Sequence, residues 1–515
     1  MMSMLRHWWQ PLLSGVLIGT SYIPFPPWAS LFCFVPLWLF WLRQQRVRQV
    51  LLGGVVSAFV FTLIGFNWVT YVLHEFAHLD WPVAVFGMVL FALLAHLFVP
   101  LAGWLWFMGR RRFGWSPSVS VTALALITTL CEAHGPTLFD WNFGYTWYGS
   151  EVPLFQWAEV VGFSGLSALT VLANLPLLRA WQLRRQAAGW RWLAAVMAVF
   201  GLLNVGGVWL ERRLPTPDAQ LRVALVQGNI GNFEKLSAEL GRGFQDGILK
   251  AYMAATDRAL AGVTGSLDFV VWPETAFPAL LGERLRPTPY SEALSAFLHD
   301  RKLPLVTGAY GIDTASGLLT NSLFVLDASG ALVSPHYSKT ILLAFGEYLP
   351  GEQWFPRLRE WLPPTGQFAR GAGPTTVLAL NGLRMGPQIC YESLFPGFSR
   401  SLADLGAQFI VNATNDSWYG TWQEPWQHMR MTLARGVELR RPVLRSTNTG
   451  ISTVGLASGK VLEQSPLHAV WAGVYEVPYL KQPPVTFYQR TGWWGVPLLL
   501  WSSLLGVLVW GMRRR

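Results

Sequence analysis

Long apolar segments alternate with short arginine-containing ones over the first 210 residues, and one more apolar segment lies near the C-terminus. Most of them approach the roughly 20 residues that an α-helix needs to cross the hydrocarbon core of a bilayer. The pattern predicts an α-helical transmembrane bundle of about eight spans. The predicted spans are Trp8–Ile23, Trp28–Leu42, Val50–Leu73, Trp81–Met108, Ser118–Leu130, Trp157–Leu178, Trp190–Leu210 and Gly492–Met512.

Arginine is distributed unevenly between the loops that would connect these spans. Because cytoplasmic loops carry an excess of Lys and Arg, the asymmetry predicts that both termini are cytoplasmic. The long segment 211–490 then lies outside the cytoplasm, between a seven-span domain at 1–210 and a last span at 491–515. The arginines are Arg43, Arg46, Arg48, Arg110–Arg112, Arg179, Arg184, Arg185, Arg191 and Arg513–Arg515, and the loops without Lys or Arg are Ser21–Pro27, His74–Asp80 and His134–Gln156.

Composition agrees with a membrane protein. Hydrophobic residues make up 52% of the 515 positions and charged residues only 13%, a balance typical of membrane proteins. The 28 tryptophans fit the same class, because indole rings favour the membrane interface. The net charge of +10 is explained by the loop arginines, and the chain carries no nucleic-acid-binding motif.

Segment 211–490 has a different pattern, in which short β-rich runs alternate with helical ones. This alternation predicts a layered α/β domain. The predicted strands are Arg222–Gln227, Leu267–Trp272, Pro304–Gly308, Ser322–Leu326 and Gln408–Asn412, and the predicted helices are Tyr290–Asp300 and His428–Arg440.

Cys390 is a candidate nucleophile. Cys33 and Cys131 lie in the apolar runs, so Cys390 is the one cysteine predicted to face an oxidising compartment, where an unpaired thiol risks oxidation. A chain that keeps such a thiol usually needs its chemistry. The structural alternative is a small buried residue at a strand end.

Glu274 and Lys339 supply the groups that a thiol nucleophile needs. Glu274 follows Trp272-Pro273 at the end of a predicted strand, Lys339 follows Tyr337-Ser338, and Cys390 follows Gln388-Ile389. A carboxylate can take the thiol proton, and an ammonium can stabilise the oxyanion that forms when the thiolate attacks a carbonyl. Taken singly, Glu274 and Lys339 are also compatible with surface charges.

These motifs resemble a known family. Trp272-Pro273-Glu274-Thr275, then Lys339 with Phe345-Gly346-Glu347-Tyr348, then Cys390-Tyr391-Glu392 are similar to the Glu-Lys-Cys triad of the nitrilase superfamily. The flanking spans are similar to those of its membrane-bound branch, the bacterial apolipoprotein N-acyltransferases. Further segments that agree with that branch are Val226–Asn229, Asn412–Trp418, Gln427-His428 and Arg445–Gly450.

The resemblance implies an αββα nitrilase-like sandwich on the periplasmic side of an inner-membrane helical bundle. It implies acyl transfer from a phospholipid, of the phosphatidylethanolamine kind, to the α-amine of diacylglyceryl-modified apolipoproteins. Cys390 would be the nucleophile, Glu274 the general base, and Lys339 the oxyanion donor together with a backbone N–H near Tyr391. Glu347 and Glu392 would orient Lys339.

No metal or organic cofactor is expected. The predicted exported histidines show no ligand spacing, and no glycine-rich phosphate-binding motif occurs. These histidines are His299, His336, His428 and His468.

Two segments depart from the family pattern and concern the substrate loops. Lys235 is followed by Leu236, where the family usually has Lys-Trp. Gly135 and the run Leu138–Trp141 replace the usual Arg and Gly-Phe-Pro-Trp.

Two other functions remain open from the sequence. A membrane-tethered nitrilase-type amidase would use the same triad with water as acceptor. A transporter or channel would use segment 211–490 as a binding module, although the spans hold few ionisable residues such as Glu132 and Glu159, which argues against ion coupling. The aromatic segments of the exported domain are either lipid-facing arms or core packing. They are Trp354-Phe355, Trp361–Pro364, Trp418, Trp422 and Trp426.

Overall fold

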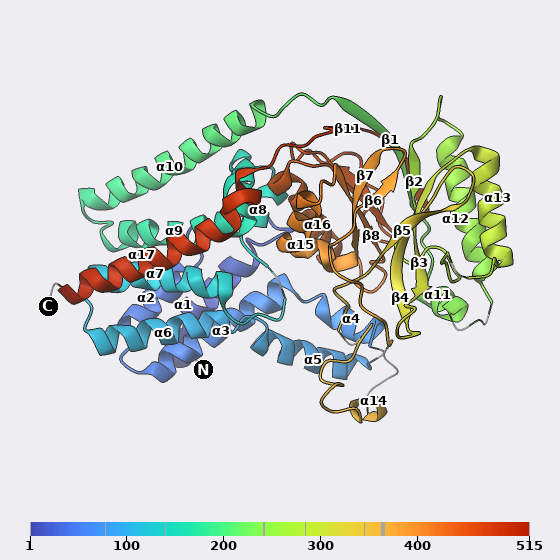
Figure 1. Cartoon of the computed structure of the whole chain (residues 1–515). Coiled ribbons are helices and arrows are strands. Elements are labelled where there is room, and N and C mark those ends of the chain that lie inside the picture. Colours follow the sequence, from blue (N-terminus) through green and yellow to red (C-terminus); the bar gives the residue numbers. More distant parts are fainter. Residues whose placement is uncertain are drawn as a thin grey trace. The chain divides into compact units, whose positions relative to one another are not determined.

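The computed structural model describes residues 2–77, 79–139, 141–239, 241, 243–283, 285–344, 346–361 and 366–513. The chain divides into two compact units (Figure 1). The first comprises the chain up to His74, Leu79–Leu214 and the residues from Val485 onward, and the second comprises Pro215–Pro484 with a short segment that begins at Glu75. Predicted features at His78, Asp140, Phe345, Leu362–Pro364 and Arg514–Arg515 lie outside the described residues.

The first unit is helical throughout. Its apolar side chains repeat all round most helices, as expected for helices that have no aqueous face. The helices are α1 (Met2–Gly19), α2 (Val35–Arg43), α3 (Val47–Gly65), α4 (Val69–Glu75), α5 (Trp81–Leu94), α6 (Phe98–Phe113), α7 (Pro117–His134), α8 (Gly144–Gly149), η1 (Pro153–Trp157), α9 (Ala158–Gln182), α10 (Ala187–Arg212), η3 (Tyr488–Gly492) and α17 (Trp493–Arg513).

Five helical stretches among the described residues are long and apolar enough to cross a membrane. The predicted span Val50–Leu73 is broken at Phe66, between α3 and α4. The predicted span Trp28–Leu42 is helical only from Val35, so α2 has nine residues and is too short to cross a bilayer as a helix. The five stretches are Val47–Gly65, Trp81–Phe113, Pro153–Gln182, Ala187–Arg212 and Tyr488–Met512.

The turns that precede α2 are buried at Ser30, Cys33 and Phe34, and side chains of other helices satisfy their backbone there. Asn174 of α9 accepts from the Phe34 N–H at 2.9 Å and donates to the Ser30 carbonyl at 3.3 Å. Ser14 of α1 donates to the Cys33 carbonyl at 2.5 Å. Irregular backbone is tolerated at membrane depth only when protein groups satisfy it in this way.

The second unit contains two β-sheets. One has the strand order β11-β1-β2-β3-β4-β5 and the other β10-β9-β8-β7-β6. The strands are β1 (Ala219–Gln227), β2 (Phe269–Val271), β3 (Leu305–Ile312), β4 (Leu319–Leu326), β5 (Leu332–Ser338), β6 (Leu378–Leu380), β7 (Leu383–Ile389), β8 (Phe409–Thr414), β9 (Val443–Thr447), β10 (Thr453–Gly455) and β11 (Trp471–Tyr479).

Helices cover the outer faces of both sheets. Figure 1 shows α12 and α13 together beside the six-stranded sheet, and α15 and α16 contact strands of the other sheet. The unit is therefore an αββα sandwich, as predicted. Its helices are α11 (Asn232–Glu239), α12 (Gln245–Leu260), α13 (Pro289–Arg301), α14 (Leu358–Trp361), η2 (Cys390–Leu394), α15 (Pro396–Asp404) and α16 (Glu424–Leu439).

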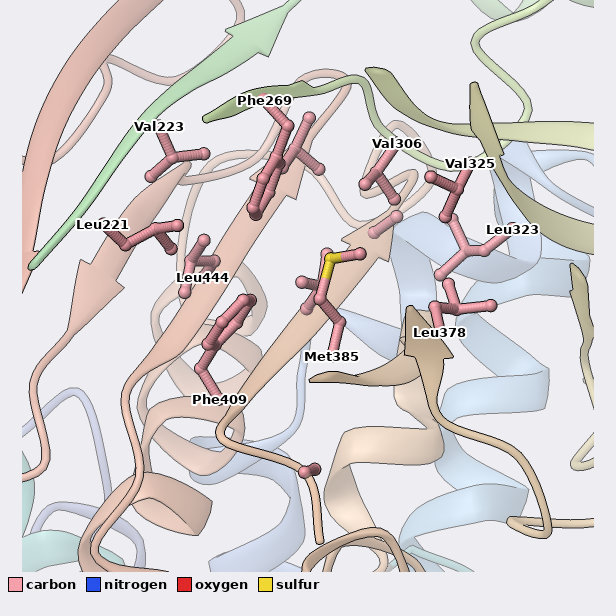
Figure 2. Close-up of a cluster of buried hydrophobic side chains, with 14 of the residues drawn as sticks. Leu221, Val223, Phe269, Val306, Leu323, Val325, Leu378, Met385, Phe409 and Leu444 are labelled. Atoms are coloured by element: carbon pink, nitrogen blue, oxygen red, sulfur yellow. The ribbon is translucent and has the colours of Figure 1, made fainter. Parts of the chain in front are cut away.

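The central strands are buried on both faces. In β1, Val223 and Leu225 belong to the core between the two sheets, whereas Ala224 and Val226 belong to the core under α12 and α13. Figure 2 shows the first of these cores, with Phe269 and Phe409 facing each other from opposite sheets. Burial on both sides explains why these strands appear in the sequence as unbroken apolar runs.

All five strands and both helices predicted with a range in this unit are confirmed as elements, whereas no range was predicted for the remaining strands. β5 contains Pro335 and is exposed over much of its length as a sheet edge, and β11 contains Pro478. β7 contains Gly386 and Pro387. Proline and glycine are depleted in strands, so these segments lack the pattern by which strands are recognised.

Gly308 of β3 allows the chain to pass closely at the end of β2. Its N–H donates to the Pro273 carbonyl at 3.1 Å, and its own carbonyl accepts from the Phe277 N–H at 3.0 Å. A Cβ atom at this position would lie 2.5–2.6 Å from backbone atoms of Pro273, Glu274 and Thr275. The absence of a side chain at Gly308 therefore sets where Glu274 lies.

We predict that Gly308→Ala destabilises the second unit by about 1–3 kcal/mol, because the added methyl group must displace backbone. Thermal unfolding of the full chain measures the effect. Gly262→Ala is the matched control, since a Cβ there meets no atom within 4 Å. Equal melting temperatures for the two variants would show that the strand end does not need this close approach.

Candidate active site

Glu274, Lys339 and Cys390 come together at the ends of three strands. Glu274 follows β2, Lys339 follows β5, and Cys390 follows β7. The Lys339 Nζ atom lies 3.1 Å from Glu274 Oε1, and these two side chains are only 2% and 8% exposed. The Cys390 residue is 5% exposed. The sequence placed these residues at strand ends, and the two sheets bring those ends to one place.

The Glu274 carboxylate is held at both oxygens. Asn321 of β4 donates to Oε1 at 2.7 Å, and the backbone N–H of Asn415 donates to Oε2 at 2.9 Å. Asn321 also donates to Glu347 Oε1 at 2.9 Å. Asn321 was not found from the sequence, because it lies inside an apolar strand and no local pattern marks it as a partner of Glu274.

Lys339 is a buried ammonium between two carboxylates. Besides Glu274, its Nζ atom donates to Glu347 Oε1 at 2.9 Å. Burial alone would lower the pKa of Lys339, but the charges of Glu274 and Glu347 outweigh burial and raise this pKa well above its usual value. The two carboxylates therefore favour the charged form of Lys339.

Cys390 occupies a strained backbone position directly after β7. Its φ angle is +55°, in the left-handed region that residues with a side chain rarely adopt. Such strain is typical of functional sites, because it aims a side chain out of the regular structure. Burial raises the pKa of the thiol, the charge of Glu274 raises it further, and Lys339 opposes the rise. The resting thiol is therefore protonated and needs a base to become a nucleophile.

Glu392 does not orient Lys339 directly, which corrects the role that the sequence suggested for it. Its Oε1 atom accepts from the Tyr337 hydroxyl at 2.8 Å and from the N–H groups of Thr340 and Ile341 at 2.7 and 3.1 Å. Its Oε2 atom accepts from the Ile389 N–H at 2.8 Å. Glu392 thus ties the backbone that follows Lys339 to the strand end that precedes Cys390.

Tyr391 lies beside Lys339 and closes the site. Its hydroxyl donates to the Leu342 carbonyl at 2.7 Å, and its ring centroid is 6.0 Å from the Lys339 Nζ atom. That distance is within the range of a cation–π contact. The ring therefore shields the ammonium from water on one side.

A buried polar cluster lies behind Cys390. Ligand atoms of Asp416, Glu424 and His428 lie within 4.8 Å of one another, a grouping that could hold a metal ion and that the histidine spacing did not indicate. Arg445, however, donates to Asp416 Oδ2 at 2.6 Å and already balances the charge of that carboxylate. Burial, with the charge of Asp416, raises the pKa of Glu424 well above its usual value, which favours the neutral acid. The arrangement is that of an internal ion pair with neutral neighbours.

Lys235 joins the site to an apolar cavity of about 380 Å³. Its Nζ atom donates to the Glu274 carbonyl at 3.3 Å and to Thr275 Oγ1 at 3.2 Å. The cavity walls include Phe277, Tyr310 and Phe368. Lys235, the lysine of the family's Lys-Trp pair, therefore contacts the backbone of Glu274, and the departure from the family pattern lies at the next residue, Leu236.

Three of the aromatic side chains singled out in the second unit are strongly exposed. Trp354 is 72% and Phe355 67% exposed, and Trp422 is 59% exposed. Exposure of such large apolar rings excludes core packing for these three and is typical of interaction surfaces.

Both parts of the chain match known protein families. Residues 222–471 match the carbon-nitrogen hydrolase family, and residues 14–176 match the apolipoprotein N-acyltransferase N-terminal domain. The chain is 39% identical to the apolipoprotein N-acyltransferase of Bdellovibrio bacteriovorus, over 98% of this chain and 96% of that one. It is 31% identical to that of Geobacter metallireducens, over 98% of this chain and 94% of that one. With both domains matched and near-complete coverage, the chain belongs to the apolipoprotein N-acyltransferase family.

Proposed function

We propose that this protein transfers an acyl chain from a phosphatidylethanolamine-like phospholipid, through a thioester on Cys390, to the α-amine of a diacylglyceryl-modified N-terminal cysteine of lipoproteins. The observation that carries the mechanism is the buried Lys339 ammonium, 3.1 Å from Glu274 at the strand ends where Cys390 is also buried. The proposal assigns Glu274, Lys339 and Cys390 to catalysis, and Glu347, Tyr391 and Glu392 to its support.

The first half-reaction makes the thioester. Glu274 takes the proton of Cys390, and the sulfur attacks the ester carbonyl of the phospholipid. Lys339 and the N–H of Tyr391 stabilise the tetrahedral oxyanion. The ester C–O bond then breaks, Glu274 returns the proton to the departing alkoxide, and a lysophospholipid leaves.

The second half-reaction passes the acyl chain to an amine. The neutral α-amine of the lipoprotein attacks the thioester carbonyl, and the same donors stabilise the second oxyanion. Glu274 takes a proton from the attacking nitrogen, the C–S bond breaks, and the proton passes to the Cys390 sulfur. The products are an N-acyl amide and the free thiol, so one acid–base group serves both steps.

Membership of the acyltransferase family favours an amine over water as acceptor. The match to the acyltransferase N-terminal domain and the near-full-length relatives distinguish this chain from a nitrilase-type amidase, for which the hydrolase domain alone would suffice. The exposure of Trp354 and Phe355 supports the proposal that both substrates enter from a lipid surface.

We further propose that the chain crosses the inner membrane eight times, seven times in domain 1–210 and once in domain 491–515. Domain 211–490, which lies between them, would be in the periplasm. Arginine asymmetry supports this topology, and the last turn of α6 carries Arg110–Arg112. The second crossing requires the buried turns before α2, whose backbone is paired with Asn174 and Ser14.

We predict that Cys390→Ser folds normally but forms no acyl-enzyme, because a serine hydroxyl is a far weaker nucleophile beside a carboxylate base. Incubation with phospholipid, followed by intact-mass measurement, detects the acyl group on wild-type protein. Hydroxylamine should remove that group, as it does from a thioester. A serine variant with near-normal transfer would rule out the thioester.

Lys339→Arg should lose activity almost as severely as Lys339→Ala, by about 10²-fold or more in the rate of acyl-enzyme formation. A guanidinium is planar and larger than an ammonium, so it cannot take the same place between Glu274 and Glu347. Single-turnover kinetics measure the rate. If Lys339→Arg keeps most of the wild-type rate, Lys339 only pairs charges, and backbone donors alone must stabilise the oxyanion.

For the topology, reporter fusions after Arg112 and Arg515 should score cytoplasmic, and a reporter fusion within segment 211–490 should score periplasmic. The arginine-rich loops are the physical reason. A periplasmic signal from the fusion after Arg112 or Arg515 would overturn the eight-crossing arrangement.

A further inference from the structure

The carbonyl oxygen of Cys390 is anchored by two buried side chains. Asn412 of β8 donates to it from Nδ2 at 3.0 Å, and Ser393 of η2 donates from Oγ at 3.2 Å. Neither donor side chain is exposed. Because Cys390 has a φ of +55°, its backbone keeps this conformation only if surrounding contacts hold it.

Asn412 and Ser393 are both connected by hydrogen bonds to one nitrogen atom of Arg445, Ser393 through Thr432. The Arg445 Nη1 atom donates to Asn412 Oδ1 at 2.7 Å and to Thr432 Oγ1 at 3.2 Å. Thr432 lies 2.7 Å from Ser393, and since Ser393 gives its hydrogen to the Cys390 carbonyl, Thr432 must be the donor of that pair. Two series of hydrogen bonds therefore run from Arg445 to the Cys390 carbonyl, one through Asn412 and one through Thr432 and Ser393. In both series each donor lies on the Arg445 side of its acceptor.

Asp416 holds Arg445 in place. Its Oδ2 atom accepts from Arg445 Nη2 at 2.6 Å, and its Oδ1 atom accepts from Thr414 at 3.0 Å and contacts His428 Nδ1 at 3.1 Å. Although burial raises the pKa of Asp416, the charge of Arg445 and the hydrogen bond from His428 hold it well below its usual range. The carboxylate is therefore charged, which a fully buried guanidinium requires.

We propose that Arg445 is a positioning residue that fixes the peptide group between Cys390 and Tyr391, so that the Tyr391 N–H faces the oxyanion in both half-reactions. The peptide group is planar, and its C=O and N–H point in opposite directions, so anchoring the carbonyl fixes the direction of the N–H. Two donors on the carbonyl also polarise the peptide and strengthen its N–H as a donor. The inference rests on the proposed thioester chemistry.

The test compares two reactions of the same thiol. Thioester formation passes through an oxyanion, whereas alkylation by iodoacetamide does not. Thr432→Val removes the hydrogen bonds between Arg445 and Ser393 with little change in side-chain volume. Adding Asn412→Ala also removes the hydrogen bonds between Arg445 and the Cys390 carbonyl that pass through Asn412. We expect thioester formation to fall about 10-fold in the single variant and toward 10²–10³-fold in the double variant, the range for loss of one oxyanion donor. The alkylation rate should stay at the wild-type value.

Two further variants test Arg445 itself and provide a control. Arg445→Lys keeps the charge but loses the planar fork, so it should slow thioester formation more than alkylation. Thr453→Val is the matched control, because Thr453 is an equally buried threonine of β10 whose hydroxyl donates to the backbone carbonyls of Leu462 and Glu463. It should leave both rates unchanged, and thermal unfolding reports any general loss of stability.

Equal slowing of alkylation and thioester formation would overturn the inference, since the network would then only support the thiol. An unchanged rate of thioester formation in the double variant would overturn it as well. If wild-type protein is alkylated but forms no thioester with phospholipid, the proposed function itself fails, and this inference falls with it.

Discussion

The Lys339 ammonium is the charge on which the rest of the site depends. It is nearly inaccessible to water and lies about 3 Å from one oxygen of Glu274 and one of Glu347. Removing charged groups from water is costly, and the cost is offset only when the groups are paired and hydrogen-bonded. Asn321 donates to both carboxylates, so three strand ends and one loop converge on a single cation. Loss of Lys339 would leave two buried carboxylates facing each other.

The αββα sandwich explains how the backbone of the site can be rigid while its side chains remain reactive. β2 and β7 are buried in the core between the two sheets, the edge strand β5 adds Tyr337 to that core, and the reactive residues begin where these strands end. Glu392 ties two of those ends together through four accepted hydrogen bonds. Because the backbone positions are fixed by packing, Cys390 can be kept in a strained conformation and still point its thiol at the same place.

The sequence revealed the reactive residues more readily than their surroundings. Glu274 follows the apolar run of β2, Lys339 precedes the apolar run that begins at Thr340, and Cys390 follows Gln388-Ile389, so the local sequence marks each of them as a possible strand end. Asn321 lies inside a strand and was not singled out, because its partners Glu274 and Glu347 are far away in the chain. Arg445 was marked only as part of a segment that agrees with the family, and its contacts with Asn412, Thr432 and Asp416 required the structure. The same limit applies to the turns before α2: apolar composition predicted a helix, whereas pairing with Asn174 and Ser14 allows turns there. The proline-containing strands β5 and β11 were missed because their sheet neighbours, not their own residues, make them strands.

The central claim is that the acyl chain on Cys390 goes to an amine. The most direct measurement is mass spectrometry of a diacylglyceryl-modified lipoprotein N-terminus after incubation with the purified full chain and phospholipid. The account predicts a mass gain of one acyl group on the α-amine, with one lysophospholipid released for each peptide modified. Release of free fatty acid with an unmodified N-terminus would contradict it, because water would then be the acceptor.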